Sequence, residues 1–211
     1  IDQAGFLSLW RFQSGSDMPL PFSRLQCHNK RGAGLCFVDS SVVIATVGAS
    51  QGSNGNGSLC LWDVLLPPAQ AQVASCIGAH ADGARCVLHC PAEQSLVSGG
   101  ERGEMAIFDL RQRKLREKWT AHSMAVQALA LADSKRVLSA SGDAGICLWA
   151  VDAPLAPPPD SEGTGVLCAE GQPRRQWARA HDAQTILAPL VGSGKLGYNG
   201  VTALTTIPAG S

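Results

Sequence analysis

The feature that most constrains the fold of this 211-residue chain is a strand-like segment that recurs and ends near an aromatic side chain. The recurring segments are LSLWRF, LCLWDV, MAIFDL and ICLWAV, with Trp10, Trp62, Phe108 and Trp149 at the matching position. Successive aromatic residues are 52, 46 and 41 positions apart. Each follows an alternation of apolar residues that is typical of a β-strand. A strand that returns at such a period indicates a chain built from repeated sheet units.

A second marker, a histidine, recurs in phase with the aromatic residue. The histidines are His28, His80, His122 and His181, and the last three stand in an Ala-His dipeptide. From His80 to Phe108 there are 28 positions, and from His122 to Trp149 there are 27. This distance has room for three strands of about five residues with tight turns. The pattern resembles the WD repeat, which usually has Gly-His at this place and a period of about 40 to 45 residues.

We therefore expect an all-β fold, a partial WD-repeat β-propeller with about four blades of a seven-blade ring, because a complete ring needs roughly 300 residues. The chain reads as a single propeller fragment over 1–211. Residues 1–27 end one blade, 28–79, 80–121 and 122–180 each form a blade, and 181–211 start the next. The third of these blades contains a Pro-rich, acidic stretch, which predicts a mobile loop over 153–171. The stretch Ala125–Ala132 favours a helix by propensity, but its place in the repeat predicts a strand.

Four residues of the blade 122–180 have the spacing of the structural tetrad of WD repeats. They are His122, Ser139, Asp143 and Trp149, with Ser139 four residues before Asp143 and Trp149 six after it. In that tetrad the indole N–H donates to the hydroxyl, the hydroxyl donates to one imidazole nitrogen, and the other nitrogen donates to the carboxylate. We expect these four residues to form one buried network that stabilises the blade.

The other blades carry incomplete versions of the tetrad. In the blade 80–121, His80 and Ser98 are present, but Arg102 stands in place of Asp and Phe108 in place of Trp. Because Phe108 has no N–H and Arg102 has no acceptor, we expect water or backbone groups to satisfy His80 and Ser98. The blade 28–79 has a weaker version, whose members are His28, Thr46, Asn56 and Trp62.

Three features suggest chemistry and have simpler interpretations. The Ser, His and Asp of the tetrad could be mistaken for a hydrolase triad, but a triad needs an exposed serine and an oxyanion hole. Cys86, His89 and Cys90 lie close together, but no second cluster with zinc-ligand spacing follows. The basic run 111–118, RQRKLREK, predicts a solvated turn between the third and fourth strands of its blade that also protects a sheet edge. An electrostatic contact with a protein or an acidic lipid is the alternative for this run.

Composition excludes several classes of partner and cofactor. Lys plus Arg number 17 and Asp plus Glu also number 17, so no net field favours nucleic acid. No Gly-rich phosphate loop leads from a strand into a helix. The eight cysteines are too scattered for a disulfide scaffold, and we expect reduced and mostly buried thiols. We expect no enzyme activity, no catalytic residue, no metal and no cofactor.

Longer stretches of the chain resemble the C-terminal propeller of the DmX-like, or rabconnectin, family. They are DQAGFLSLW, QCHNK, VVIAT, LCLWD, SGGERG followed by IFDLRQR, and the GVTAL region. The resemblance covers most of the chain in order, and it departs at the Pro-rich insertion, the Gly/Asn loop at 51–58 and Trp149-Ala150. Members of this family are very large proteins.

The resemblance implies a function as well as a fold. It implies a non-catalytic scaffold that binds other proteins, namely subunits of the vacuolar proton-pumping ATPase (V-ATPase) and other WD-repeat assembly factors. It also implies a cytoplasmic location on endomembranes and vesicles, with membrane association only through partners. The repeat alone leaves an alternative open, which is a general WD-repeat adaptor such as a ubiquitin-ligase substrate receptor.

Overall fold

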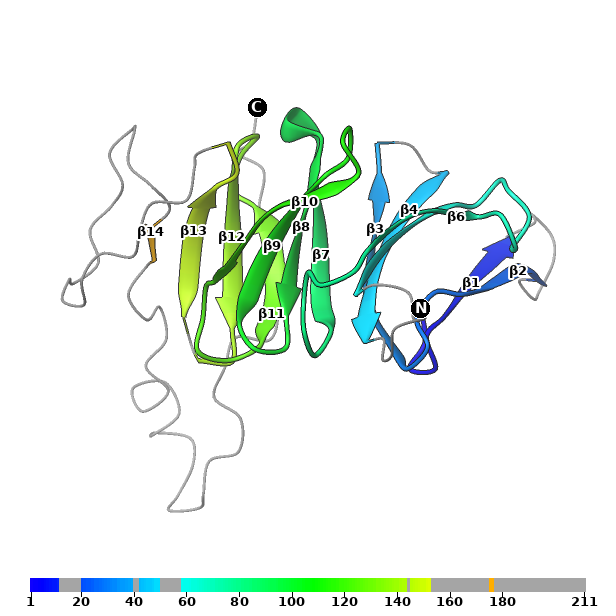
Figure 1. Ribbon diagram of the computed structural model, residues 1–211, viewed down its shortest axis with the longest axis horizontal. Coiled ribbons are helices and arrows are strands. Elements are labelled where there is room, and N and C mark those ends of the chain that lie inside the picture. Colours follow the sequence, from blue (N-terminus) through cyan, green and yellow to red (C-terminus); the bar gives the residue numbers. More distant parts are fainter. Residues whose placement is uncertain (12–19, 40–41, 50–57, 144, 153–174, 177–211) are drawn as a thin grey trace, which may run out of the picture.

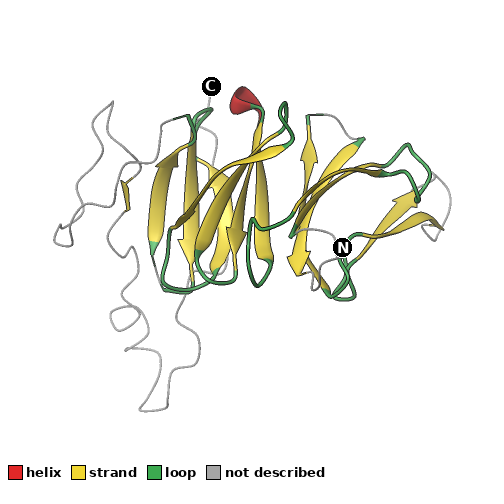
Figure 2. Ribbon diagram, in the orientation of Figure 1, coloured by secondary structure: helices red, strands yellow, loops and turns green. Residues whose placement is uncertain are grey.

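The computed structural model describes residues 1–11, 20–39, 42–49, 58–143, 145–152 and 175–176. These residues form antiparallel β-sheets and one 3-10 turn, η1 (Pro91–Glu93), so the expected all-β class is confirmed (Figure 2). Within these residues, no helix has the length and apolar character needed to cross a membrane.

The strands form four sheets in which each strand pairs with the next strand in the chain (Figure 1). The first sheet contains β1 (Phe6–Arg11) and β2 (Leu20–Gln26). The second contains β3 (Arg31–Val38), β4 (Val43–Ala49), β5 (Leu59–Asp63) and β6 (Gln72–Cys76). The third contains β7 (Ala84–Cys90), β8 (Ser95–Gly100), β9 (Glu104–Asp109) and β10 (Lys114–Thr120). The fourth contains β11 (Val126–Leu131), β12 (Arg136–Ser141), β13 (Ile146–Ala150) and β14 (Arg175–Gln176).

The sheets stand face to face in the manner of propeller blades (Figure 1). The first strands of successive complete sheets touch, since β3 contacts β7 and β7 contacts β11. These three strands are therefore the inner ones, and β6 and β10 lie at the outer rim. Short antiparallel strands in chain order, with the first strands gathered on one side, make a WD-type propeller fragment.

Apolar cores fill the spaces between neighbouring sheets. One core joins the first and second sheets around Leu7 and Ile44, the next joins the second and third around Val47 and Leu96, and the last joins the third and fourth. Because the third sheet is covered on both faces, all six residues of its strand β8 are buried. The packing therefore explains why the strands show less alternation than a half-exposed sheet would.

The recurring aromatic residue packs against the preceding sheet. Trp62, Phe108 and Trp149 are each buried in the core shared with the sheet before their own. Trp10, at the same position of the first sheet, is 50% exposed. Its sheet has two described strands and no described sheet on its outer side, so the indole has no covering layer among the described residues.

Two predictions about local structure differ in outcome. The Ala-rich stretch Ala125–Ala132 is strand β11, as its position in the repeat predicts. The basic run 111–118 does not lie wholly in a turn, because the fourth strand of its sheet starts at Lys114 and includes the second half of the run. The predicted loop 153–171 and the start of a further blade at 181–211, with His181, lie outside the described residues.

Candidate functional site

The four residues His122, Ser139, Asp143 and Trp149 come together at one end of the fourth sheet. Trp149 Nε1 donates to Ser139 Oγ at 2.7 Å, and His122 Nε2 lies 2.7 Å from the same oxygen. Because Ser139 Oγ receives the indole proton, its own hydroxyl donates to His122 Nε2, and the imidazole proton is placed on Nδ1. His122 Nδ1 lies 3.4 Å from Asp143 Oδ1, a contact longer than an ordinary N–H···O bond.

Asp143 also closes the turn that it stands in. Its carboxylate accepts the backbone N–H groups of Ser123 at 2.9 Å and of Gly145 at 2.8 Å. Burial alone would raise the pKa of Asp143, but these amides and His122 hold it below its usual value. Burial lowers the pKa of His122, and Asp143 only partly opposes that effect. The network therefore contains a carboxylate and a neutral imidazole near neutral pH.

A three-residue version is present in the second sheet. Trp62 Nε1 donates to Thr46 Oγ1 at 2.9 Å, and His28 Nε2 lies 3.1 Å from that oxygen. His28 and Thr46 are completely buried. The predicted fourth member, Asn56, lies outside the described residues.

The third sheet brings the side chains of His80 and Ser98 together. His80 Nε2 lies 2.8 Å from Ser98 Oγ, so these two atoms pair with each other. Within the described residues His80 Nδ1 has no hydrogen-bond partner, and the expectation that water or a backbone group satisfies it stays a prediction. On the other side of the ring, His80 Nδ1 lies 4.0 Å from Glu104 Oε2. Phe108 is buried in the core between the second and third sheets and has no hydrogen bond donor to contribute. Glu104, two positions after Arg102, therefore brings a carboxylate close to the ring without a hydrogen bond, and sequence reasoning missed it.

Arg102 points away from this network and pairs with Asp82 at the surface. Its backbone N–H donates to Glu104 Oε2 at 3.0 Å, which holds the carboxylate in place. Burial lowers the pKa of His80 to about 4, although Glu104 opposes the shift. At neutral pH the third sheet therefore has a neutral His80 beside the Glu104 carboxyl group.

Two of the three described histidine loops, those of His28 and His122, also rest on a glycine of the preceding sheet, a feature that the sequence analysis did not identify. Gly103 has φ +81°, and its carbonyl accepts the N–H groups of Ala121 and His122. Gly5 has φ +82°, and its carbonyl accepts the N–H groups of Cys27 and His28 in the same way. A Cβ at either glycine would lie about 2 Å from the histidine carbonyl oxygen, at 2.1 Å for Gly103 and 1.9 Å for Gly5. A glycine a few residues ahead of the recurring aromatic was the available signal.

The burial of Ser139 bears on the hydrolase interpretation. Ser139 is completely buried, and its oxygen is engaged by Trp149 and His122 together. A catalytic serine must reach the substrate carbonyl with an oxyanion hole nearby. The geometry of these residues is that of a packed structural network.

The cysteines behave as packing residues. The seven described cysteines are free thiols, five of them buried, while Cys168 lies outside the described residues. Cys86 donates to the carbonyl of Val126 at 3.6 Å, a contact from the third sheet to the fourth. Burial raises the pKa of Cys86 and of Cys90 to about 12, so neither is a thiolate at neutral pH. In the described part of the chain, no three His, Cys, Asp or Glu side chains are grouped as metal ligands.

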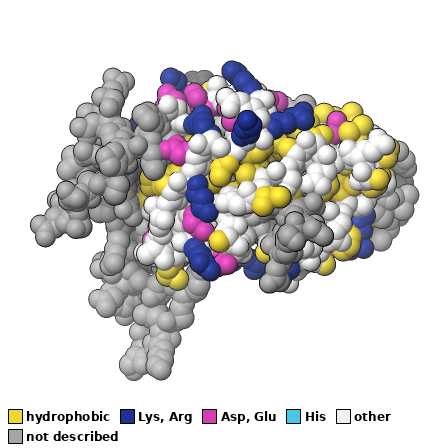
Figure 3. Space-filling model, in the orientation of Figure 1, with side chains coloured by type: hydrophobic (Ala, Val, Ile, Leu, Met, Phe, Trp, Pro, Cys, Tyr) yellow, Lys and Arg dark blue, Asp and Glu magenta, His cyan; other side chains and the backbone are white. Residues whose placement is uncertain are grey.

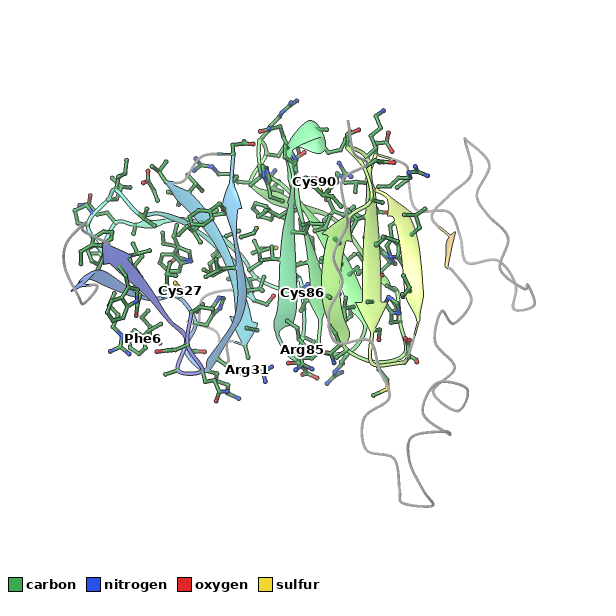
Figure 4. All side chains as sticks on the ribbon, turned by 180° about the vertical axis from the view of Figure 1, so that it is seen from behind. Phe6, Cys27, Arg31, Arg85, Cys86 and Cys90 are labelled. Atoms are coloured by element: carbon green, nitrogen blue, oxygen red, sulfur yellow. The ribbon has the colours of Figure 1, made fainter. Side chains whose placement is uncertain are left out.

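An ion-pair cluster joins the second and third sheets at one end of their inner strands. Glu101 accepts a hydrogen bond from Arg31 of β3 and lies 3.6 Å from Arg85 of β7. Figure 4 shows Arg31 and Arg85 at the same end of these neighbouring strands. Because all three side chains are partly exposed, the cluster adds little to the stability of the fold.

Comparison with known proteins agrees with this architecture. The chain is 36% identical to DmX-like protein 1 of Mus musculus over 160 residues, and 35% identical to that of Homo sapiens over 158 residues. Each match covers 72% of this chain and 5% of the relative. The chain is also 28% identical to WD repeat-containing protein 55 of Arabidopsis thaliana over 140 residues, covering 66% of this chain and 36% of that protein.

No protein-family model matches the chain. The matches to DmX-like protein 1 nevertheless extend over most of the length of this chain, and the sheets of this chain have the order and packing of WD blades. The chain spans only a small part of these relatives. It belongs to the DmX-like family of WD-repeat proteins and is a propeller fragment of that family.

Proposed function

We propose that this chain is a non-catalytic scaffold in a complex that promotes the assembly and regulation of the vacuolar proton-pumping ATPase. The observation that carries the proposal is the 36% identity to DmX-like protein 1 over 72% of the chain. WD-repeat relatives support the general part, a module that binds proteins. The proton pump is the specific part, and it comes from the family resemblance.

The described geometry is consistent with a scaffold. Ser139 and His122, whose side chains could suggest catalysis, make internal contacts instead. Ser139 is completely buried and His122 is 3% exposed. The networks hold each sheet to the loop that leads into it. A stack of packed sheets whose connecting loops lie at the surface is a suitable platform for several partners.

The proposal includes location and partners. We place the protein in the cytoplasm, at the surface of endomembranes and vesicles. Its direct partners would be V-ATPase subunits and other WD-repeat assembly factors. The alternative is a general WD-repeat adaptor, such as a ubiquitin-ligase substrate receptor.

Capture of the full-length protein from cells separates these functions. The parent protein is tagged, captured while proton pumps reassemble, and compared with a version that lacks residues 1–211. We expect pump subunits and assembly factors to accompany the intact protein, and their amounts to fall without the propeller fragment. Absence of pump subunits from the intact capture would overturn the proposal. Recovery of ubiquitin-ligase subunits in their place would support the adaptor.

A further inference from the structure

The basic run of the third sheet divides into two groups of side chains. Three cations reach the backbone of neighbouring sheets: Arg113 donates to the carbonyl of Val73 at 3.4 Å, and Lys118 to that of Gly78 at 3.3 Å. Arg116 donates to the carbonyl of Val151 on the other side. These three side chains hold the outer strand β10 between the second and fourth sheets.

The side chains of Arg111 and Lys114 do not bind the backbone of a neighbouring sheet in the described part of the chain. Both side chains are exposed, and neither makes a hydrogen bond or ion pair with another described residue. The nearest carboxylate in sequence, Asp109, accepts the backbone N–H groups of Arg111 and Gln112, both at 2.8 Å. The turn between β9 and β10 thus presents two free cations to solvent.

An exposed apolar loop lies at the same end of the preceding sheet. Leu65 is 75% exposed and Leu66 is 40% exposed, and every residue from 65 to 70 is exposed. This loop joins β5 to β6, as the basic turn joins β9 to β10, so both connect the third and fourth strands of their sheets. Arg113, which reaches Val73 near the start of β6, links the two connections. In Figure 3, Lys and Arg side chains along the upper edge are followed toward the right by hydrophobic side chains.

Strand addition does not explain these side chains. β10 is the end strand of its sheet, but it has an irregularity between Leu115 and Glu117 and carries cations along its length. Both features prevent another strand from pairing with an edge. A stable protein interface needs about 800 Å² on each partner. A bilayer needs no shape complementarity, and a protruding apolar pair with nearby cations suits it.

We propose that Leu65, Leu66, Arg111 and Lys114 form a rim patch that contacts an anionic membrane. The two leucines enter the interfacial region between headgroups and acyl chains, and Arg111 and Lys114 contact the lipid phosphates. The two carboxylates at these turns, Asp63 and Asp109, accept backbone N–H groups of their own turns. The two turns contain five charged residues. Their three cations, Arg111, Arg113 and Lys114, outnumber the two carboxylates, so the turns carry a net positive charge that complements an anionic surface.

This inference goes beyond the proposed scaffold function, because it gives the propeller fragment a direct membrane contact. It departs from the expectation, drawn from the family resemblance, that the protein associates with membranes only through partners. The purified full chain is floated with vesicles of phosphatidylcholine and phosphatidylserine, and with vesicles of phosphatidylcholine alone. We expect binding to the anionic vesicles only, weakened by added salt. The charge reversals Arg111→Glu and Lys114→Glu together should lower vesicle partitioning about tenfold or more, and Leu65→Asp with Leu66→Asp should abolish it.

Ile77→Asp is the matched control. Ile77 is also 75% exposed and follows β6, whereas Leu65 precedes it, so its replacement should leave vesicle binding unchanged. Thermal melting of every variant checks that the fold is retained. The inference is overturned if the chain fails to bind anionic vesicles, if Ile77→Asp weakens binding as much as the leucine variants, or if an acidic peptide binds the patch while vesicles do not. A negative vesicle result would not change whether pump subunits are captured with the parent protein. The membrane contact and the scaffold function can therefore be contradicted independently.

Discussion

Glu104 brings its Oε2 atom to 4.0 Å from His80 Nδ1, on the side of the imidazole where Asp143 meets His122 in the next sheet. The two carboxylates reach their histidines from different positions. Asp143 lies in the turn between β12 and β13, whereas Glu104 is the first residue of strand β9. Gly100 makes this approach possible, because a Cβ there would lie 2.4 Å from His80 Nδ1 and 2.5 Å from Glu104 Oε2. A longer side chain thus brings a carboxylate to the same side of the histidine ring, at a distance too long for a hydrogen bond.

The charge of Glu104 should be measurable on His80. Glu104→Gln keeps an acceptor for the N–H of Arg102 but removes the negative charge that raises the pKa of His80. We expect the pKa of His80, which burial lowers to about 4, to fall further in an NMR titration of the imidazole. Asp82→Asn is the control, since Asp82 pairs with the exposed Arg102 side chain and should leave the titration of His80 unchanged. Equal titrations in wild type and Glu104→Gln would contradict this role.

The complete network should stabilise the fold more than the incomplete one. His122→Ala removes a ring that contacts both Ser139 and Asp143, and we expect a loss of about 1 to 3 kcal/mol of unfolding free energy. His80→Ala should cost less, because Ser98 receives no indole N–H and Glu104 is farther from the ring. Urea unfolding of both variants measures the difference. Equal losses would mean that Asp143 and Trp149 add nothing to the network.

Stability should fall in mild acid because of the buried histidines. The pKa of His80 is about 4 in the folded chain and about 6.5 when unfolded, so the unfolded state binds the proton first. The stabilising effect is complete above about pH 6.5 and is lost as the pH falls toward about 4, a loss on the order of 3 kcal/mol. Burial lowers the pKa of His122 and of His89 as well, so both contribute in the same direction. The lowered pKa of Asp143 affects stability at more acidic pH. Its contribution to the free energy of unfolding is lost only as the pH falls below the usual range of aspartate pKa values.

Chemical unfolding at a series of pH values tests this. His80→Gln cannot be protonated in this range, so its unfolding free energy should vary less between about pH 6.5 and 4 than that of wild type. A pH dependence that is the same in both proteins would show that His80 is not buried in its neutral form.

The spacing of the sequence markers predicts the fold well, because the repeat is a property of packing. The aromatic position recurs since each of Trp62, Phe108 and Trp149 must fill the space against the preceding sheet. The carboxylate of the third sheet could not be predicted in this way. Glu104 is outside the position that the tetrad spacing assigns, and only the three-dimensional turn brings it to His80. The contacts of Arg113, Arg116 and Lys118 to other sheets were missed for the same reason.

The indole N–H should account for a small, measurable part of stability. Trp149→Phe leaves Ser139 Oγ without the proton that it accepts at 2.7 Å, and we expect a loss of about 0.5 to 1.5 kcal/mol or more. Trp10→Phe is the control, because Trp10 is half exposed and packs against no described preceding sheet. Thermal melting should therefore show a lower Tm for Trp149→Phe and little change for Trp10→Phe. The reverse order would contradict the assigned roles of the two indoles.

The contact between Gly103 and the loop that carries His122 can be tested by its effect on stability. Gly103 and Gly78 both have positive φ, +81° and +84°, so replacement by alanine costs each the left-handed strain of about 1 to 2 kcal/mol. Only at Gly103 would the new Cβ meet backbone, 2.1 Å from the carbonyl oxygen of His122, whereas nothing lies within 4 Å at Gly78. The extra loss in Gly103→Ala over Gly78→Ala thus measures how firmly the loop with His122 is held on the third sheet. We expect Gly103→Ala to unfold at clearly lower urea concentration, and matching midpoints would show that the loop moves aside freely.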